Sequence, residues 1–259
     1  MIAPYRVHDP KLSDQIPPGF CARAVMTKVP RAGKVKTRLT PPLTPFEAAA
    51  LNSCFLRDTT RAILNASNNG DSAGIAVYTP VGAEESYNGT LPDEFQLVAQ
   101  RGDTFGDRLN FAVEDLLALG FQSVCLIDSD SPTVPPQIYE QATRLLAQSG
   151  DRIVLGPSDD GGYYLIGLKK PHREVFKQIN WSTKHVSSQT RERAAGIGVE
   201  VKALPAWYDI DDGATLARLC EELFGRDSKV TGGYEAPHTR SYLAEFLRRE
   251  GRARIWPNE

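Results

Sequence analysis

The chain of 259 residues has no run of about 18 consecutive apolar residues, the length that a helix needs to cross a bilayer. Its first twenty residues carry charged groups and four prolines, where a secretory signal peptide needs an uninterrupted apolar stretch. The sequence therefore predicts a soluble, cytoplasmic protein with no membrane span.

Cysteine is also scarce. Cys21, Cys54, Cys125 and Cys220 lie far apart, and none belongs to a CxxC or CxxH pattern. They could form two disulfides, but a chain of this length that is 41% hydrophobic can build a normal core without them. We expect four free thiols among apolar neighbours.

The chain lacks an excess of positive charge. Its formal net charge is −2 and its pI is near 6.1, whereas proteins that bind nucleic acid as their main partner usually carry a basic domain. We therefore expect no nucleic-acid partner.

Apolar segments with the spacing of strands alternate with segments that have the spacing of helices. The expected strands are 20–28, 74–80, 95–100, 124–127, 152–157 and 163–168, with an extended segment at 199–210. The expected helices are 44–66, 104–120, 135–148, 182–196 (with Ser182 as its cap) and 214–225. This order predicts an α/β fold in which a mostly parallel sheet is covered by helices on both faces. Residues 1–19 are predicted to form an irregular arm, and 226–259 a helical appendage to the domain at 20–225.

The segment "VCLIDSDSP" drives a buried strand directly into two carboxylates, Asp128 and Asp130. In an open α/β sheet, ligands bind beyond the carboxyl ends of the strands. Two desolvated carboxylates repel each other unless a cation compensates them, and Mg²⁺ or Mn²⁺ with oxygen ligands is suited to that position. The alternative is that one aspartate only forms a turn beside Pro132 or caps the next helix.

A second acidic cluster, "YDIDD", ends the extended segment at 199–210. Alternation places Asp209 and Asp211 on one face, and Asp212 is suited to cap the following helix. We expect Asp211 to join Asp130 and Asp128 at one divalent cation.

Between Lys28 and Arg38, "KVPRAGKVKTR" has five basic residues and no acidic one. It lacks the glycines of a Walker A or Rossmann loop. If it is extended, alternation aims Lys34, Lys36 and Arg38 in one direction, which suits phosphate oxygens. The alternative is a solvated charged loop.

The motifs "MTKVPRAGKVKTRLTPPL", "QRGDTFGDRL", "DSPTVP", "GPSDDGGYYLIGL", "FKQINWST" and "YDIDD" occur in the order found in a bacterial family described as DUF2064 glycosyltransferases, which the chain resembles over about 26–220. The resemblance implies a GT-A or nucleotide-diphospho-sugar transferase fold, with a Rossmann-like three-layer mixed sheet. Molybdenum-cofactor and phospholactate guanylyltransferases share this fold.

The resemblance also implies roles for individual residues. Nucleotide and phosphate binding fall to Lys28, Lys36, Thr37, Arg38, Gln100 and Gly102. The acceptor or sugar side falls to Asp160, Gly161, Gly162, Tyr163, Trp181, Ser182 and Thr183. Without the resemblance, "DDGGYY" is a tight turn between strands, and "WST" is a buried tryptophan with a serine cap.

The sequence predicts a metal-dependent glycosyltransferase that takes a nucleotide-sugar donor and a small acceptor, acting as a monomer or homodimer. Asp130, with the cation, and Asp160, with the acceptor hydroxyl, are the expected catalytic residues. The main alternative is a nucleotidyltransferase that acts on a phosphorylated metabolite and releases pyrophosphate. A nucleotide-sensing module without activity is less consistent with two intact acidic clusters.

Overall fold

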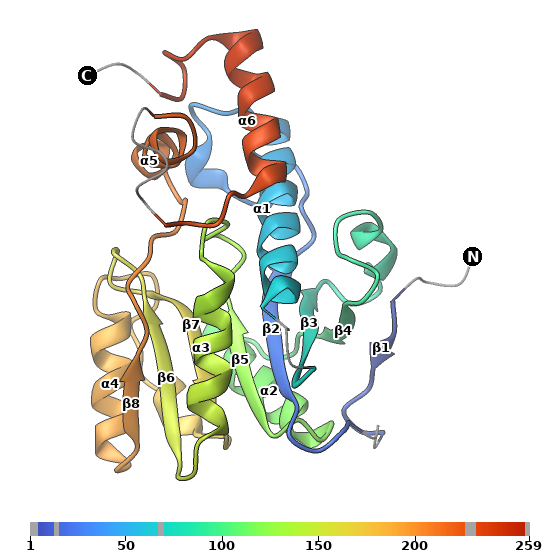
Figure 1. Ribbon diagram of the computed structural model, residues 1–259, viewed down its shortest axis with the longest axis vertical. Coiled ribbons are helices and arrows are strands. Elements are labelled where there is room, and N and C mark those ends of the chain that lie inside the picture. Colours follow the sequence, from blue (N-terminus) through green and yellow to red (C-terminus); the bar gives the residue numbers. More distant parts are fainter. Residues whose placement is uncertain (1–4, 13–15, 67–69, 226–231, 257–259) are drawn as a thin grey trace.

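The computed structural model describes residues 5–12, 16–66, 70–225 and 232–256. Within these residues, eight strands form one sheet with the order β1-β4-β3-β2-β5-β7-β6-β8 (Figure 1). The strands are β1 (Val7–His8), β2 (Cys21–Lys28), β3 (Ser72–Thr79), β4 (Gln96–Ala99), β5 (Ser123–Ile127), β6 (Arg152–Pro157), β7 (Tyr163–Leu168) and β8 (Glu200–Ala203).

Strand β7 runs antiparallel to both of its neighbours, β5 and β6, and the other neighbouring pairs are parallel. The sheet is therefore mixed, as the family resemblance implied. The carboxyl ends of β2, β3, β4 and β5 lie at one edge, and β7 begins at that edge because its direction is reversed. Residues 7–8 pair with β4, so the expectation of a wholly irregular arm is wrong at these positions.

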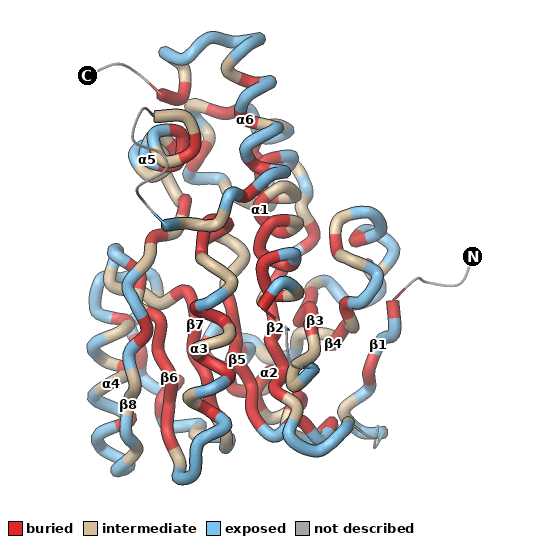
Figure 2. The backbone as a smooth tube through the Cα atoms, viewed as in Figure 1, coloured by how far each residue is buried: buried red, intermediate tan, exposed pale blue. Residues whose placement is uncertain are grey.

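Helices cover both faces of the sheet, which gives three layers (Figures 1 and 2). The helices are α1 (Pro45–Asn65), α2 (Phe105–Ala118), α3 (Pro136–Ala147), α4 (Val186–Gly196), α5 (Gly213–Phe224) and α6 (Pro237–Glu250), with 3₁₀ turns η1 (Thr37–Leu39), η2 (Glu84–Tyr87) and η3 (Arg173–Phe176). One buried cluster joins α1 and α3 to the sheet, and a second joins α2 and α4 to its other face.

Local side-chain chemistry fixes where several helices begin. Thr44 and Glu47 form a reciprocal capping box at α1, as the sequence indicates. The helix expected from residue 182 instead begins at Val186. The N-cap position of α4 is occupied by His185, so the predicted capping role of Ser182 is wrong.

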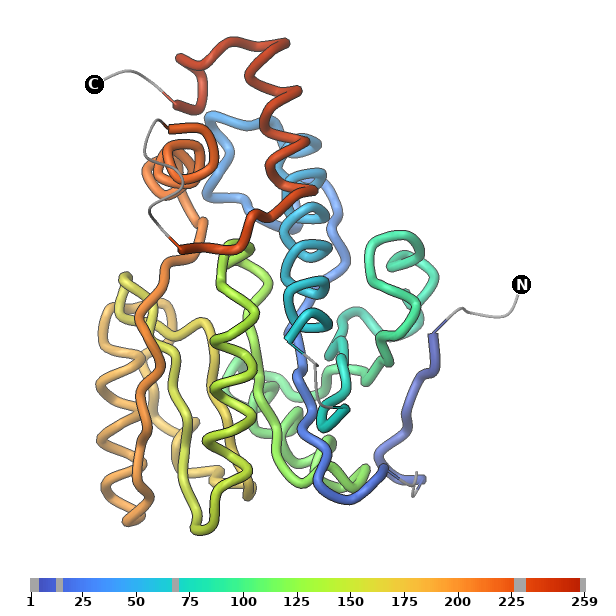
Figure 3. The backbone as a smooth tube through the Cα atoms, in the orientation of Figure 1, coloured from blue at the N-terminus to red at the C-terminus, as the bar shows by residue number. Residues whose placement is uncertain are grey.

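The helices α1, α5 and α6 lie close together beyond the sheet (Figure 3). A third buried cluster joins them. It contains Leu39 from the basic loop, Ile210 from the acidic segment, and Leu243 and Phe246 from α6. Asp58 of α1 fixes the start of α6, since its carboxylate accepts backbone N–H groups of residues 238 and 239 at 3.0 and 2.7 Å. Residues 232–256 thus pack against α1, while the domain boundary at residue 225 stays a prediction.

All four cysteines are free thiols, as predicted: three are buried and Cys54 is half-buried. Over the residues described, no helix combines the length and the apolar composition that crossing a membrane requires.

Candidate active site

A cleft of about 340 Å³ opens at the edge of the sheet where β2, β3, β4 and β5 end. Its lining residues are Met26, Thr27, Lys28, Val35, Lys36, Thr37, Arg38, Asn52, Thr79, Gln100, Phe105, Arg108, Ser129, Asp130 and Asp211. The fold thus brings the basic loop and both acidic segments to one cleft, where the sequence analysis placed them.

The basic loop is not extended, so the prediction that alternation aims three cations in one direction is wrong. Lys36 has a left-handed backbone conformation with a φ of 47°, and η1 follows it directly. The turn directs Lys36 inward, where its side chain is only 5% exposed, whereas that of Arg38 is 68% exposed. Lys34 is exposed and does not line the cleft.

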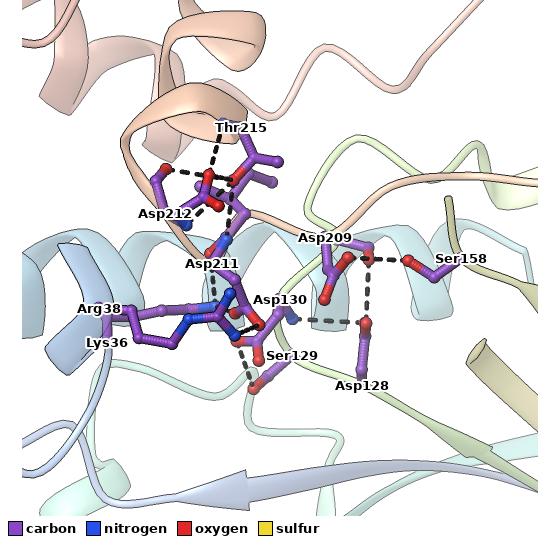
Figure 4. Close-up of polar contacts among 12 residues, drawn as sticks. Lys36, Arg38, Asp128, Ser129, Asp130, Ser158, Asp209, Asp211, Asp212 and Thr215 are labelled. Carbon is purple, nitrogen blue, oxygen red and sulfur yellow. Dashed lines mark hydrogen bonds and ion pairs between the residues drawn. The ribbon is translucent and has the colours of Figure 1, made fainter. Parts of the chain in front are cut away.

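Lys36 joins the two acidic segments (Figure 4). Its Nζ lies 2.8 Å from Asp130 Oδ1 and 3.0 Å from Asp211 Oδ1, and it donates to the carbonyl oxygen of Ile210 at 2.7 Å. Arg38 reaches the other oxygen of Asp211 at 3.2 Å. The backbone N–H of Ile210 also donates to the carbonyl oxygen of Asp130 at 2.9 Å, which fixes the two segments side by side.

Burial and charge act on Lys36 in opposite directions. Desolvation alone would lower the pKa of its ammonium, but the nearby carboxylates of Asp130 and Asp211 outweigh it, so the pKa is raised. Lys36 is therefore a fixed positive charge at neutral pH.

Asp128 does not join this group. Its carboxylate accepts from the hydroxyl of Ser131 at 2.9 Å and from the backbone N–H of Asp130 at 3.3 Å (Figure 4). These bonds correspond to the alternative in which the aspartate forms a turn beside Pro132. Surrounding protein desolvates the carboxyl group, and Asp130 and Asp209 add negative charge nearby, so the pKa of Asp128 is raised well above its usual value.

The residues of "YDIDD" take separate roles. Because β8 ends at Ala203, strand alternation does not extend to them. Asp209 accepts from Ser158 Oγ at 2.8 Å, and burial raises its pKa. Asp212 caps α5 as predicted, accepting the backbone N–H of Thr215 at 2.9 Å. The Thr215 hydroxyl accepts in turn from the backbone N–H of Asp211 at 3.0 Å, so it helps to hold the metal-ligand candidate.

Asp130, Asp211 and the Ile210 carbonyl surround one point with three oxygens, and that point already attracts a cation, the ammonium of Lys36. Mg²⁺ in transferase sites uses one or two carboxylates and completes its shell with water and substrate phosphates. Over the described parts of the chain there is no cluster of three His, Cys, Asp or Glu side chains placed to hold a metal by themselves. The residues present therefore fit a cation that shares its shell with a phosphate.

The predicted nucleotide residues differ in their positions. Gln100 lies in the cleft, where its amide donates to the carbonyl oxygens of Thr27 and Val77 at 3.1 and 2.8 Å. Gly102 does not line the cleft; a Cβ there would approach the backbone of Arg108 to 3.0 Å, and its φ is 112°. The absence of a side chain at Gly102 therefore allows the loop before α2 to pack against the start of that helix.

The "DDGG" segment is a tight turn between β6 and β7. Asp160 accepts the backbone N–H of Gly162 at 2.8 Å. Gly161 has a φ of 91° and packs against the backbone of Lys184 so closely that a Cβ would lie 2.2 Å from its carbonyl oxygen. The turn accounts for both glycines without a ligand, and neither they nor Asp160 line the cleft.

A second cavity of about 160 Å³ adjoins the cleft and shares Met26, Phe105, Ser129 and Asp130 with it. Its other lining residues are Leu109, Leu126, Ile127, Asp128, Tyr163, Tyr164 and Ile166. Among all the described residues that line this cavity there is no cation, and two, Asp128 and Asp130, carry carboxyl groups. The hydroxyl of Tyr163 is buried near that of Thr190, and burial raises the pKa of Tyr163.

Sequence reasoning missed Phe105, which lies between the two cavities with 51% of its surface exposed. Its ring packs edge-on against Trp181, with centroids 4.9 Å apart, so Trp181 supports the cavities without lining either. Ser182 and Thr183 are exposed and also line neither. A large apolar residue directly after the capping Thr104, where a helix is normally exposed, is a signal that could have identified Phe105.

Arg38→Ala is expected to weaken the binding of a nucleoside diphosphate by about 1.5–3 kcal/mol while leaving nucleoside binding unchanged, because the family resemblance assigns this hydrogen-bonding cation to the phosphates. Stability should change by less than about 1 kcal/mol, since the pair with Asp211 is exposed to solvent. Calorimetric titration measures both ligands. Arg31→Ala, a substitution of an exposed residue in the same loop, is the control. Equal losses of diphosphate affinity in the two variants would show that the loop acts only through its overall positive charge.

Comparison with solved structures shows which proteins have a similar fold. A crystal structure from Desulfovibrio desulfuricans G20, described as a "putative nucleotide-diphospho-sugar transferase", has a TM-score of 0.75 and 27% identity, over 90% of this chain and 98% of that chain. A cytidylyltransferase from Leptospira borgpetersenii serovar Hardjo-bovis has a TM-score of 0.51 and 9% identity, over 93% and 98%. A nucleotidyl transferase from Methanothermobacter thermautotroptrophicus has 0.50 and 13%, over 78% and 96%. The predicted fold class is confirmed, and the likeness points to a transferase.

Residues 63–183 match the bacterial family described as "Uncharacterized protein conserved in bacteria (DUF2064)". The resemblance predicted from the motifs is thereby confirmed over this range, which includes "QRGDTFGDRL", "DSPTVP" and "DDGGYYLIGL". The basic loop and "YDIDD" lie outside the matched residues. No curated protein sequence matches the chain.

Proposed function

We propose that the protein transfers a glycosyl group from a nucleoside-diphosphate sugar to a small, uncharged hydroxyl acceptor, with the help of a divalent cation. The observation that carries this proposal is the meeting of Lys36, Arg38, Asp130 and Asp211 in one cleft at the carboxyl edge of the sheet. A diphosphate needs cations along its oxygens, and its metal ion needs carboxylates on the opposite side; this cleft offers both.

Each group has a role in that reaction. Lys28, Lys36, Thr37 and Arg38 would bind the phosphates, with Gln100 at the base side of the cleft. Asp130 and Asp211 would hold the cation, which supplies Lewis-acid stabilisation to the negative charge that develops on the leaving diphosphate. Once the cation and the diphosphate are bound, these groups would face the charge that develops on the leaving diphosphate, so little reorganisation is needed at the moment of reaction.

The second cavity supports an uncharged acceptor. The described residues that line it are apolar and aromatic side chains together with Asp128, Ser129 and Asp130, and no cation is among them. A phosphorylated or carboxylated acceptor would lose its hydration there with no positive charge to compensate it. We place the acceptor hydroxyl between this cavity and Asp130, with Tyr163 on its wall. Asp160 is proposed to orient it from the neighbouring turn, with residues 181–183 on the same side.

The products distinguish this reaction from nucleotidyl transfer. Glycosyl transfer breaks the bond between the sugar C1 and the phosphate oxygen and releases a nucleoside diphosphate, whereas nucleotidyl transfer breaks the α–β phosphate bridge of a triphosphate. We expect phosphorus NMR, after incubation with Mn²⁺, a panel of nucleotide sugars and neutral hydroxyl acceptors, to show a nucleoside diphosphate and no pyrophosphate. Pyrophosphate release from a triphosphate and a phosphorylated acid would establish nucleotidyl transfer instead.

A further inference from the structure

The ammonium of Lys36 lies where the proposed divalent cation has to lie. Its three contacts, at 2.7–3.0 Å, are to Ile210 O, Asp130 Oδ1 and Asp211 Oδ1. These are the oxygens that the two acidic segments direct to one point. The side chain is 5% exposed, so the ammonium is held inside the protein rather than resting on its surface.

One set of oxygens cannot serve both cations at once. Mg²⁺ binds oxygen at about 2.0–2.1 Å, which places it at the centre of the group that Lys36 Nζ now fills. Two positive charges within a few ångströms also repel strongly in a partly buried site. A divalent ion that takes Asp130 and Asp211 must therefore displace Nζ.

The cleft determines what this displacement costs. Lys36 is one of its lining residues, so an ammonium that leaves the carboxylates enters the space proposed for the diphosphate. With a nucleotide present, phosphate oxygens replace the carboxylates as its partners. Without one, the displaced ammonium lies beside Lys28 and Arg38 and has no anion, so the metal ion alone is bound weakly.

We propose that Lys36 is an internal counter-ion that competes with the divalent cation for Asp130 and Asp211, so that the cation is bound tightly only together with the nucleotide. The proposal rests on the proposed function for its two ligands, a divalent cation and a diphosphate. It adds a coupling between them: each ligand raises the affinity of the other by the same factor, because each favours the displaced position of Lys36.

The test measures the affinity of the protein for Mn²⁺ in the absence of nucleotide. Electron paramagnetic resonance reports the concentration of unbound Mn²⁺ during the titration. Lys36→Met retains an apolar stem beside the ring of Phe55 and removes the competing charge. We expect it to bind Mn²⁺ at least about tenfold more tightly than the wild type. Lys34→Met makes the same change of charge on an exposed residue of the same loop and should match the wild type. Adding Asp130→Asn to Lys36→Met should reverse the gain.

Equal Mn²⁺ affinity in Lys36→Met and the wild type, or an equal gain in Lys34→Met, would overturn the proposal. A second measurement needs no variant: acetylation of the wild type, read by mass spectrometry, should modify Lys36 several-fold faster at saturating Mn²⁺, with Lys34 unchanged. An unchanged rate at Lys36 would also overturn it. Neither result depends on the phosphorus products, so failure of this coupling is distinguishable from failure of glycosyl transfer.

Discussion

Replacing Asp130 by asparagine is expected to weaken Mn²⁺-dependent binding of a nucleoside diphosphate about a hundredfold, or roughly 2.7 kcal/mol. Asparagine keeps the shape of the side chain but removes the charge that lies 2.8 Å from Lys36 and faces the cleft. The cation then has one carboxylate in place of two. Calorimetry with Mn²⁺ and with EDTA measures the loss, and the two titrations of the variant should nearly coincide.

Asp128→Asn is the matched control. The asparagine oxygen can accept from the backbone N–H of Asp130, and its amide N–H can donate to the Ser131 hydroxyl, which then acts as acceptor instead of donor. Burial raises the pKa of the Asp128 carboxyl, which already favours its uncharged form, so the substitution changes little charge. Binding of the diphosphate should stay within about threefold of the wild type. If the two variants lose the same affinity, or if EDTA leaves wild-type binding unchanged, the cation is not held by Asp130.

The largest loss of stability is expected at Gly161. Alanine there would place Cβ 2.2 Å from the carbonyl oxygen of Lys184 at a backbone φ of 91°, so the turn and the segment before α4 cannot both keep their positions. We expect Gly161→Ala to lower the free energy of unfolding by on the order of 3 kcal/mol, which combines backbone strain with overpacking. Urea denaturation followed by circular dichroism measures it.

Gly196 provides the comparison within the same part of the chain. It lies in the last turn of α4, and a Cβ there meets no atom within 4 Å. Gly196→Ala should therefore raise stability by about 0.4–1 kcal/mol, because alanine loses less backbone entropy on folding. If the two substitutions lowered the free energy of unfolding by similar amounts, the close contact at Gly161 would not contribute to stability.

Much of the fold could be predicted because the spacing of the apolar residues agrees with the capping and turn residues that begin and end each helix or strand. The helix at α1 carries its start signal in four consecutive residues, Thr44 to Glu47, and β5 is a continuous apolar run before Asp128. The direction of β7 could not be read from its residues, since an antiparallel strand buried on both faces has the same composition as a parallel one. The resemblance to a known fold implied only that the sheet is mixed, and the pairing in the structure shows that β7 is the antiparallel strand.

The sequence predicted which residues form the candidate site better than it predicted how their side chains are arranged. Sequence order places the basic loop and both aspartate motifs at one edge, and Lys36, Arg38, Asp130 and Asp211 do meet there. The inward position of Lys36 depends on a left-handed backbone at a non-glycine residue, which the surrounding contacts impose and which no local pattern announces. Phe105 did carry a local signal, its apolar side chain directly after the capping Thr104, but its position on the wall of both cavities shows only when the helix is placed beside the cleft.

The third buried cluster has a consequence for how the cleft can change over evolutionary time. Leu39, next to Arg38, and Ile210, next to Asp211, rest on the same cluster as Leu243 and Phe246 of α6. Small repacking under α6 therefore shifts the basic and acidic walls relative to each other without replacing any polar group. Variants from a library randomised at Leu243 and Phe246 are expected to differ from one another in cleft width by small steps. Substitutions at the charged residues change the contacts with the ligands themselves.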